Sequence, residues 1–214
     1  MIKANRIIIL AIIAISFLIG FYLYPTAPVK MASHWNIAGE VDGYMSKFWG
    51  LFLMPIISLA MFLLFLLIPR MDPMKENVQK FRKYFDRFIL LTMLFLFYIY
   101  VLTISWSYGA RFDMGRLMAP AIGILFFYAG VLIEKSKRNW FIGIRTPWTL
   151  SSESVWDKTH KLGGKLFKIS GVIAMLGFIF PGFAFELMIF PAILFSIWTI
   201  VYSYFEFKKE NFKK

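Results

Sequence analysis

The stretch WGLFLMPIISLAMFLLFLLI, residues 49–68, runs for twenty positions without a charged residue. About 20 helical residues cross the roughly 30 Å hydrocarbon core of a bilayer, so this stretch predicts a transmembrane helix. Five more apolar stretches occur, at residues 7–23, 88–108, 117–133, 166–180 and 183–205. The pattern predicts an all-α integral membrane protein with six transmembrane helices.

The stretch at residues 166–180 is the shortest of the six and decides whether the count is five or six. It is followed by Pro181-Gly182, a turn signal, and then by the last apolar stretch. One helix through both stretches would be about twice as long as a span requires. We therefore expect a tight helical hairpin at this point.

The composition is typical of a membrane protein. Apolar residues make up 59% of the 214 residues and charged residues only 17%, whereas soluble domains carry about a quarter charged residues. The chain has no Cys, which excludes disulfides, thiolate metal sites and a Cys nucleophile. The net charge of +12 is explained by membrane topology. We expect a bilayer with anionic headgroups as a partner, and no nucleic acid.

The first apolar stretch follows Lys3 and Arg6, as the core of a secretory signal would. At 17 residues it is longer than the usual signal core of about 7–15 residues, and no small-residue cleavage site follows it. We interpret it as an anchor that stays in the chain.

The basic residues predict the orientation of the helices. Of the 24 Lys and Arg residues, only Lys30, Lys47, Arg111 and Arg116 lie in the first, third and fifth connections. The others gather near the two termini and around the second and fourth connections. Because basic connections stay in the cytoplasm, we expect both termini to be cytoplasmic in a multi-pass protein of the cell (plasma) membrane.

The chain is expected to form one membrane domain over residues 1–214. Within it, residues 1–87 hold the first two spans and the long outer loop. Residues 88–214 hold the last four spans and the long inner loop.

The outer loop, YPTAPVKMASHWNIAGEVDGYMSK at residues 24–47, has the alternation of a short strand around residues 29–35. Asp42-Gly43 favours a tight hairpin turn. We expect a strand-turn unit that lies on the outer headgroup surface. Its candidate ligand-binding residues are His34, Trp35, Asn36, Gly39, Asp42 and Gly43.

Three potential metal ligands, His34, Glu40 and Asp42, fall within nine residues of the outer loop. Their spacing matches no recognised metal motif, and no second His lies nearby. The alternative is a surface loop in which these polar groups complete turns. A catalytic role for His34 lacks a neighbouring nucleophile. We expect no metal, no cofactor and no catalytic residue.

The inner loop and its continuation, NWFIGIRTPWTLSSESVWDKTHKLGGK at residues 139–165, form the other polar stretch long enough to hold a site. Gly143 and Pro147 indicate an extended segment. Ser151 or Ser152 suits the N-cap of an interfacial helix. We expect that helix to end or bend at Gly163-Gly164 before the fifth span.

An Arg in this loop suits forked hydrogen bonds to a phosphate or a carboxylate, and Arg145 is the candidate. His160 follows Trp156 by one helical turn and suggests a response to pH near neutrality. The alternative is that these residues fix the loop against the helices and bond its backbone. The candidate functional residues here are Arg145, Thr146, Pro147, Trp148, Trp156 and His160.

Two motifs resemble a known family. The string GIRTPWTL at residues 143–150, with VW at 155–156 and TH at 159–160, resembles the motif of the SdpI family of bacterial membrane immunity proteins. The pattern HWN…G…DGY…SK at residues 34–47 resembles a membrane domain of unassigned function that is often found ahead of that motif. The resemblance covers both halves of the chain.

This resemblance implies a six-helix, non-enzymatic protein of the immunity or signalling type, which protects a cell from a secreted membrane-active peptide. It also implies two partners, a peptide toxin outside and a cytoplasmic regulator inside. On this view the outer loop meets the peptide, and the Arg145 loop transmits or stabilises the response.

A small-molecule or ion transporter or channel is the alternative class. Coupled transport places ionisable groups within the bilayer, whereas the expected spans hold few, with Glu186 beside the outer turn. A membrane enzyme is the third class. His34 and Asp42 are expected outside and Arg145 and His160 inside, and neither side has a nucleophile, a base and an orienting group.

Overall fold

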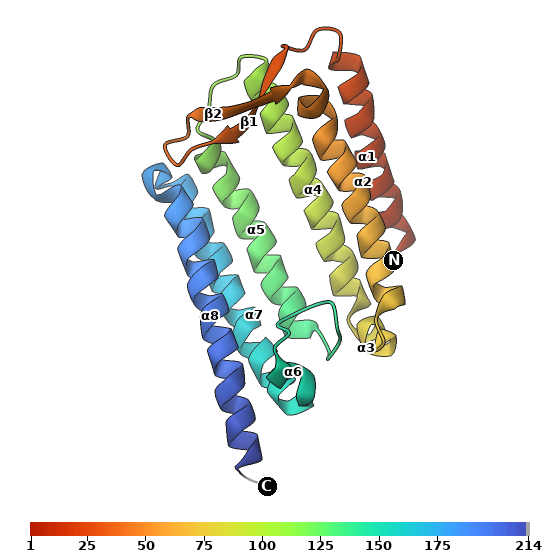
Figure 1. Cartoon of the computed structure of the whole chain (residues 1–214), viewed down its shortest axis with the longest axis vertical. Helices are drawn as coiled ribbons and strands as arrows, with labels where there is room; N and C mark the ends of the chain where they lie inside the picture. The colour runs from red at the N-terminus through yellow and green to blue at the C-terminus, as the bar shows by residue number, and fades with distance from the viewer. Residues whose placement is uncertain (213–214) are drawn as a thin grey trace.

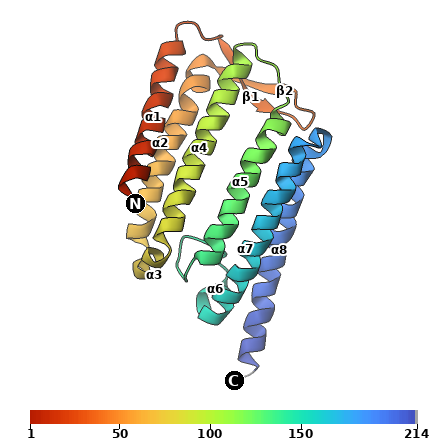
Figure 2. The ribbon, with the colours of Figure 1, turned by 180° about the vertical axis from the view of Figure 1, so that it is seen from behind.

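The structure, a computed structural model, describes residues 1–212 and is almost entirely helical. Long helices lie side by side, with a β-hairpin across one end of the bundle, the hairpin end, and short α6 at the other, the α6 end (Figures 1 and 2). Along the chain the elements are α1 (Lys3–Leu23), β1 (Lys30–Trp35), β2 (Val41–Ser46), α2 (Lys47–Met71), α3 (Lys75–Lys80), α4 (Arg82–Ser107), α5 (Met114–Lys135), α6 (Pro147–Ser151), α7 (Glu153–Met175), η1 (Leu176–Phe178), η2 (Pro181–Phe183) and α8 (Ala184–Asn211).

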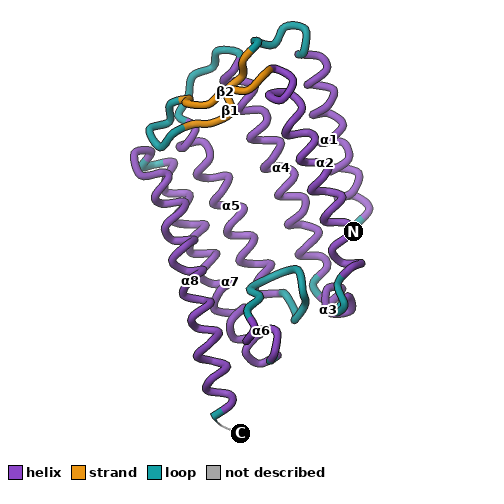
Figure 3. The backbone as a smooth tube through the Cα atoms, viewed as in Figure 1, coloured by secondary structure: helices purple, strands orange, loops and turns teal. Residues whose placement is uncertain are grey.

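The helices form two groups that meet along α4 and α5. In the first group α1, α2 and α4 pack on one another, and in the second α7 lies between α5 and α8. Tyr98 of α4 donates a hydrogen bond to the Leu117 carbonyl of α5 across the boundary, at 3.0 Å. The hairpin lies over both groups, as the orange strands in Figure 3 show.

Five helices within residues 1–212 are long and apolar enough to cross a membrane: α1, α2, α4, α5 and α8 with the turn before it. The prediction of a multi-pass membrane protein is confirmed. The expected segment at residues 166–180 forms the second half of α7 and η1. Lys161, Lys165 and Lys168 make α7 too polar to be recognised by length and composition alone.

The expected turn at Pro181-Gly182 is confirmed. The turn is the one-turn 3-10 helix η2. The helix before it, α7, packs against the helix after it, α8. Proline suits this place because it has no backbone N–H to donate. The chain therefore makes a helical hairpin and not one long helix.

The outer loop forms the predicted strand-turn unit. β1 and β2 pair antiparallel, with Lys30 opposite Ser46 and Trp35 opposite Val41. The prediction of a turn at Asp42-Gly43 is wrong, because the chain reverses at residues 36–40 and both residues lie in β2. A Cβ on Gly43 would lie only 2.9 Å from the His34 Cβ, so glycine there allows the strands to approach.

The first group of helices has a continuous apolar core, which includes Ile9, Phe62, Ile89 and Met93. Beside it lies a buried carboxylate, Asp86 of α4. It accepts hydrogen bonds from the Ile2 backbone N–H at 3.0 Å and from Arg82 Nε at 2.7 Å. A buried charge needs such partners, so Asp86 holds the start of the chain against α4.

The second group is held by glycines that bring two helix backbones together. A Cβ on Gly130 of α5 would lie 2.5 Å from the Gly164 carbonyl oxygen of α7. A Cβ on Gly171 of α7 would lie 2.5 Å from the Gly123 carbonyl oxygen of α5. The two glycines of α5 are seven residues apart, and so are the two glycines of α7, so both contacts lie on the same face of each helix. Small residues at such faces are how membrane helices approach closely.

The expected end or bend at Gly163-Gly164 is replaced by a helix that runs through both glycines. Gly163 faces Ile144 and Thr199, and Gly164 faces α5. The pair is present because there is no room for side chains, and the helical hydrogen bonds continue past it. The sequence around Gly163-Gly164 does not show which residues the two glycines pack against.

Replacing Gly171 by Ala tests this packing. We expect the variant to lose stability by about 1–3 kcal/mol, because the new methyl group must push α5 and α7 apart. Thermal unfolding of the purified protein in detergent measures the loss. The control is Gly182→Ala in η2, where a Cβ would meet nothing within 4 Å. Equal melting temperatures for the two variants would contradict the packing argument.

Candidate functional site

The turn of the hairpin is built by one side chain. Asn36 Oδ1 accepts hydrogen bonds from the backbone N–H groups of Ala38 and Glu40, both at 3.0 Å, and Asn36 Nδ2 donates to the Glu40 carboxylate. Gly39 has φ 79°, which favours glycine. The Asn and Gly of the HWN motif therefore act within the turn.

His34 and Asp42 form the one polar pair on the strands of the hairpin. His34 Nδ1 lies 2.5 Å from Asp42 Oδ1, and both side chains are exposed. Glu40 is bonded to Asn36 and does not complete a metal site with them. No group of three His, Asp or Glu side chains within residues 1–212 is placed to hold a metal ion. The pair thus cross-links the two strands at the surface.

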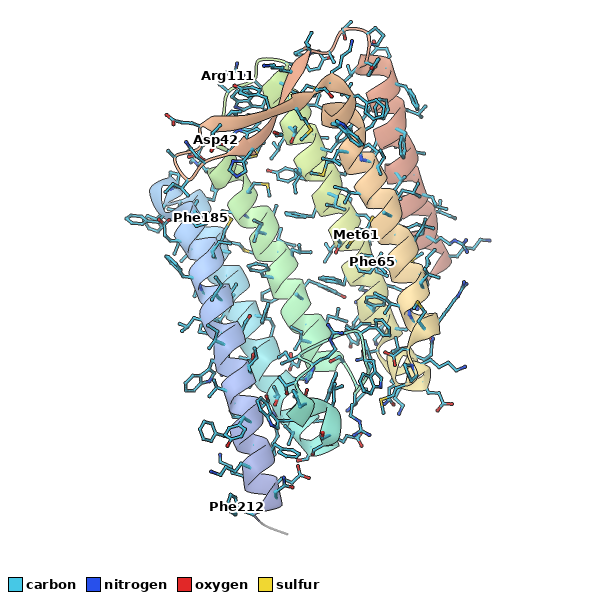
Figure 4. The ribbon with its side chains drawn as sticks, viewed as in Figure 1. Asp42, Met61, Phe65, Arg111, Phe185 and Phe212 are labelled. Carbon is cyan, nitrogen blue, oxygen red and sulfur yellow. The ribbon has the colours of Figure 1, made fainter. Side chains whose placement is uncertain are left out.

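A cavity of about 440 Å³ lies beneath the hairpin turn. It is lined by residues 35–39 of the hairpin turn, by the start of α5 and by the turn before α8 with the first turns of α8, so the hairpin and the second group of helices form it. Met114, Met118 and Met188 give it a flexible apolar wall. The cavity is here called the hairpin-end cavity, and the surface it offers is mainly apolar. In Figure 4 Phe185, also in its wall, marks its α8 side.

At the α6 end the loop of residues 136–146 crosses to the first group of helices. Asp72 Oδ2, buried at the end of α2, accepts the Trp140 backbone N–H at 2.9 Å. Asn77 Nδ2 of α3 donates to the Arg138 carbonyl at 2.9 Å. Asn139, fully buried, accepts two backbone N–H groups and donates to two carbonyls of the same loop. These bonds fix the loop in one conformation.

His160 joins this loop to α7. The Ile144 backbone N–H donates to His160 Nε2 at 2.9 Å, and His160 Nδ1 donates to the Trp156 carbonyl at 2.8 Å. Its ring stacks on Trp156, with ring centres 3.8 Å apart. A side chain on Gly143 would collide with the imidazole, and its φ of 113° also favours glycine. His160 is therefore the neutral tautomer with its proton on Nδ1.

Burial lowers the pKa of His160 to about 4. The acceptor role of Nε2 acts in the same direction, because a protonated imidazole cannot accept the Ile144 N–H. A response of His160 to pH near neutrality is therefore not supported. The imidazole serves as a fixed link between loop and helix.

The Thr-Pro-Trp part of the motif begins α6. The Thr146 hydroxyl accepts the Thr149 N–H, and the Thr149 hydroxyl accepts the Thr146 N–H, which is a capping box. Pro147 takes the first helical position, where no N–H is needed. The segment from Gly143 to Thr146 is not helical, as expected, with Thr146 in extended backbone, and the helix begins at Pro147. Trp148 packs edge-on against Tyr204 of α8, and Thr146 bonds Ser203 of α8.

Arg145 is the exception in this loop. Its guanidinium is exposed and donates to the Trp140 carbonyl at 2.7 Å. No carboxylate within residues 1–212 lies in ion-pair distance of it. Arg145 also lines a second cavity, of about 450 Å³, between the two groups of helices. This second cavity is here called the loop-end cavity.

The candidate residues thus lie in two places at opposite ends of the bundle. His34 to Gly43 form the hairpin, and Arg145 to His160 form the loop, α6 and the start of α7 (Figure 1). Sequence reasoning missed Asp72, Asn139 and Thr149, which hold the loop. An Asn before a Gly-containing loop is a turn signal that could have indicated Asn139. Nothing local indicated Asp72.

Fold and sites define a multi-pass membrane protein with a cavity at the hairpin end and a clamped polar loop at the other. Residues 135–203 match the SdpI/YfhL protein family, and residues 11–59 match a domain of unknown function, DUF1648. The chain is 27% identical over 208 residues, 97% of its length, to the immunity protein SdpI of Bacillus subtilis (strain 168), 98% of which is covered. No solved structure matches the chain. The chain therefore carries an SdpI/YfhL region behind a DUF1648 region, which confirms the family resemblance.

The pH dependence of stability tests the state of His160. The unfolded chain binds a proton below about pH 6.5 and the folded chain only below about pH 4. Stability is therefore full above pH 6.5 and declines as the pH falls towards 4, by about 3 kcal/mol in total. Thermal unfolding between pH 7.5 and 4.5 measures the decline.

The control is His160→Gln, which offers an acceptor to Ile144 but does not titrate. We expect its melting temperature to fall less steeply with pH than that of the wild type. Parallel curves for the two proteins would contradict a neutral, bonded His160.

Proposed function

We propose that α7 is a sixth membrane span and that both termini lie in the cytoplasm. Support comes from the hairpin-end cavity, whose wall contains both Ile37 of the hairpin and Gly182 of η2. The end of α7 therefore lies at the hairpin end, whereas α6 lies at the other end (Figure 2). Because α7 runs from the α6 end to the hairpin end beside α5 and α8, it would cross the membrane wherever those two helices do. The excess of Lys and Arg at the α6 end supports a cytoplasmic location of that end.

Single cysteines test this topology, because the chain has no Cys of its own. In intact cells a membrane-impermeant maleimide should label Ile37→Cys and Gly182→Cys. It should label Asn211→Cys only after permeabilisation. If Gly182→Cys were protected in intact cells while Asn211→Cys was labelled there, α7 would not cross the membrane.

We propose that the protein is a non-enzymatic immunity protein that binds a secreted, membrane-active peptide on the outer side. The observation that carries this is the hairpin-end cavity, which joins the DUF1648 hairpin to the SdpI/YfhL helix α8. Its methionines suit an apolar segment of variable shape. The name of the Bacillus subtilis relative supports the same function.

Binding in this cavity accounts for protection without chemistry. An apolar peptide held beneath the hairpin is removed from the bilayer in which it acts. Partners of this chain would then be the peptide outside and, through the clamped loop, a regulator inside. The candidate side chains at each end lack a nucleophile paired with a base, which favours binding over catalysis.

A transporter is the second candidate, and the geometry favours it less. Ion- or proton-coupled transport usually places ionisable groups along a path through the bilayer. Lys168 and Glu134 lie within the helices, but they are paired with each other at 2.6 Å. The pair links α5 to α7 beside the glycine contact, and it acts there as a cross-link.

A protection assay tests the immunity function. Expression of the wild type in cells that are sensitive to a secreted apolar peptide should raise survival, and Ala38→Trp should abolish the gain. Ala38 is exposed in the cavity wall, so an indole there occupies the space for the peptide.

The matched control is Val29→Trp, an exposed position of the same loop outside the cavity wall. It should protect as well as the wild type when membrane levels are equal. Equal protection by both variants would remove the cavity from the mechanism. A wild type that protects against no such peptide, while a liposome assay shows saturable solute flux, would favour transport.

A further inference from the structure

The loop-end cavity lies at the opposite end of the bundle from the proposed peptide site. It is enclosed by α2 and α4 on one side, by α5, α7 and α8 on the other, and by the loop of residues 141–146. Its wall is almost wholly apolar and includes Phe65, labelled in Figure 4 on the helix α2. Such a wall binds hydrocarbon and not a polar solute.

The few polar side chains of this wall are already bonded inside the protein. Ser196 donates to the Ala192 carbonyl at 2.7 Å, and Thr199 donates to the Ser196 carbonyl at 2.9 Å. Thr146 is bonded to Ser203 and Thr149. The donors of Ser196 and Thr199 are therefore already used within their own helix.

Three backbone N–H groups of the loop are also bonded inside the protein. Asn139 Oδ1 takes the N–H groups of Phe141 and Ile142, and His160 takes that of Ile144. A bound peptide would bury many N–H and C=O groups against a wall that has few free donors for them, which costs several kcal/mol per unpaired group by general estimates. A peptide is therefore disfavoured as the occupant.

Arg145 supplies the single free charge in the cavity wall. Its only hydrogen bond within residues 1–212 is the one to the Trp140 carbonyl, so most of its five N–H donors remain free. A guanidinium bonds phosphate oxygens in a forked geometry. The cavity thus joins a hydrocarbon wall to one phosphate-binding group.

The position of the cavity matches that combination. Its walls come from the last turns of α2 and the first turns of α4, where apolar helix gives way to Arg70, Arg82 and Lys83. This is the depth at which the headgroups of a bilayer begin. The adjoining basic residues attract anionic lipid over zwitterionic lipid.

We propose that the loop-end cavity binds one anionic phospholipid, with an acyl chain between the two groups of helices and the headgroup phosphate on Arg145. The lipid would fill the space between α4 and α5, where the groups meet. This site is separate from the proposed immunity function, and neither depends on the other.

The experiment is native mass spectrometry of the purified full chain with added lipid. Phosphatidylglycerol and phosphatidylcholine with identical acyl chains serve as probes, so that only the headgroup charge differs. We expect the wild type to retain phosphatidylglycerol about tenfold more strongly, as one charge-assisted contact implies. Arg145→Gln should bring the two lipids to equal binding.

Two further variants distinguish binding of the lipid's acyl chain from recognition of its headgroup. Ala129→Trp, from α5 into the cavity wall, should reduce binding of both lipids because it fills the acyl-chain space. Lys135→Gln, an exposed cation of α5 outside that wall, should leave the preference unchanged. Melting temperatures of all variants show whether each one is folded.

Three outcomes would overturn the proposal. The first is equal binding of both lipids to the wild type. The second is loss of preference in Lys135→Gln as large as in Arg145→Gln, which would indicate diffuse surface attraction. The third is competition by millimolar inorganic phosphate, which would mean that the site binds a free anion and not a lipid.

Discussion

Backbone contact between α5 and α7, made where Gly130 meets Gly164 and Gly123 meets Gly171, is the constraint on which the second half of the molecule depends. This contact keeps α7 packed along α5, although α7 carries several lysines. With α7 fixed, Trp156 and His160 are placed to receive the loop, and α8 has a partner along its length. Any side chain at these contacts would widen the bundle and withdraw the imidazole from the loop.

Much of the fold follows from chemistry that is local in sequence. Apolar stretches predicted six helices, five of which are long and apolar enough within residues 1–212 to cross a membrane. Pro181-Gly182 predicted the hairpin that separates α7 from α8. Alternation predicted β1, but the turn was misplaced, because the Asn36 side chain outcompetes Asp42-Gly43 for it. Turn propensities compare dipeptides and do not count the side-chain bonds that a longer turn can form.

The candidate residues were predicted more completely than their roles. Thr146, Pro147 and His160 were singled out as groups for a ligand or a proton, yet they cap, begin and fasten structure. Their hydrogen-bond partners are Ser203 of α8 and the backbone of the loop beside Gly143. Residue spacing in one sequence does not reveal such contacts. Arg145 differs because the loop leaves its charge unpaired within residues 1–212. Among the charged and polar residues of the motif, Arg145 is thus the one whose charge has no partner within residues 1–212, although it also bonds the Trp140 carbonyl.

The Asp72–Trp140 hydrogen bond has a mechanical consequence. The two groups of helices are tied at this bond and again by the hairpin, which bonds Ser107 of α4 through Ala32 and reaches α5 at the shared cavity. Two ties at opposite ends make a closed frame around the α4–α5 seam. Movement of one group of helices relative to the other about that seam would therefore have to break a hydrogen bond at one of the two ends.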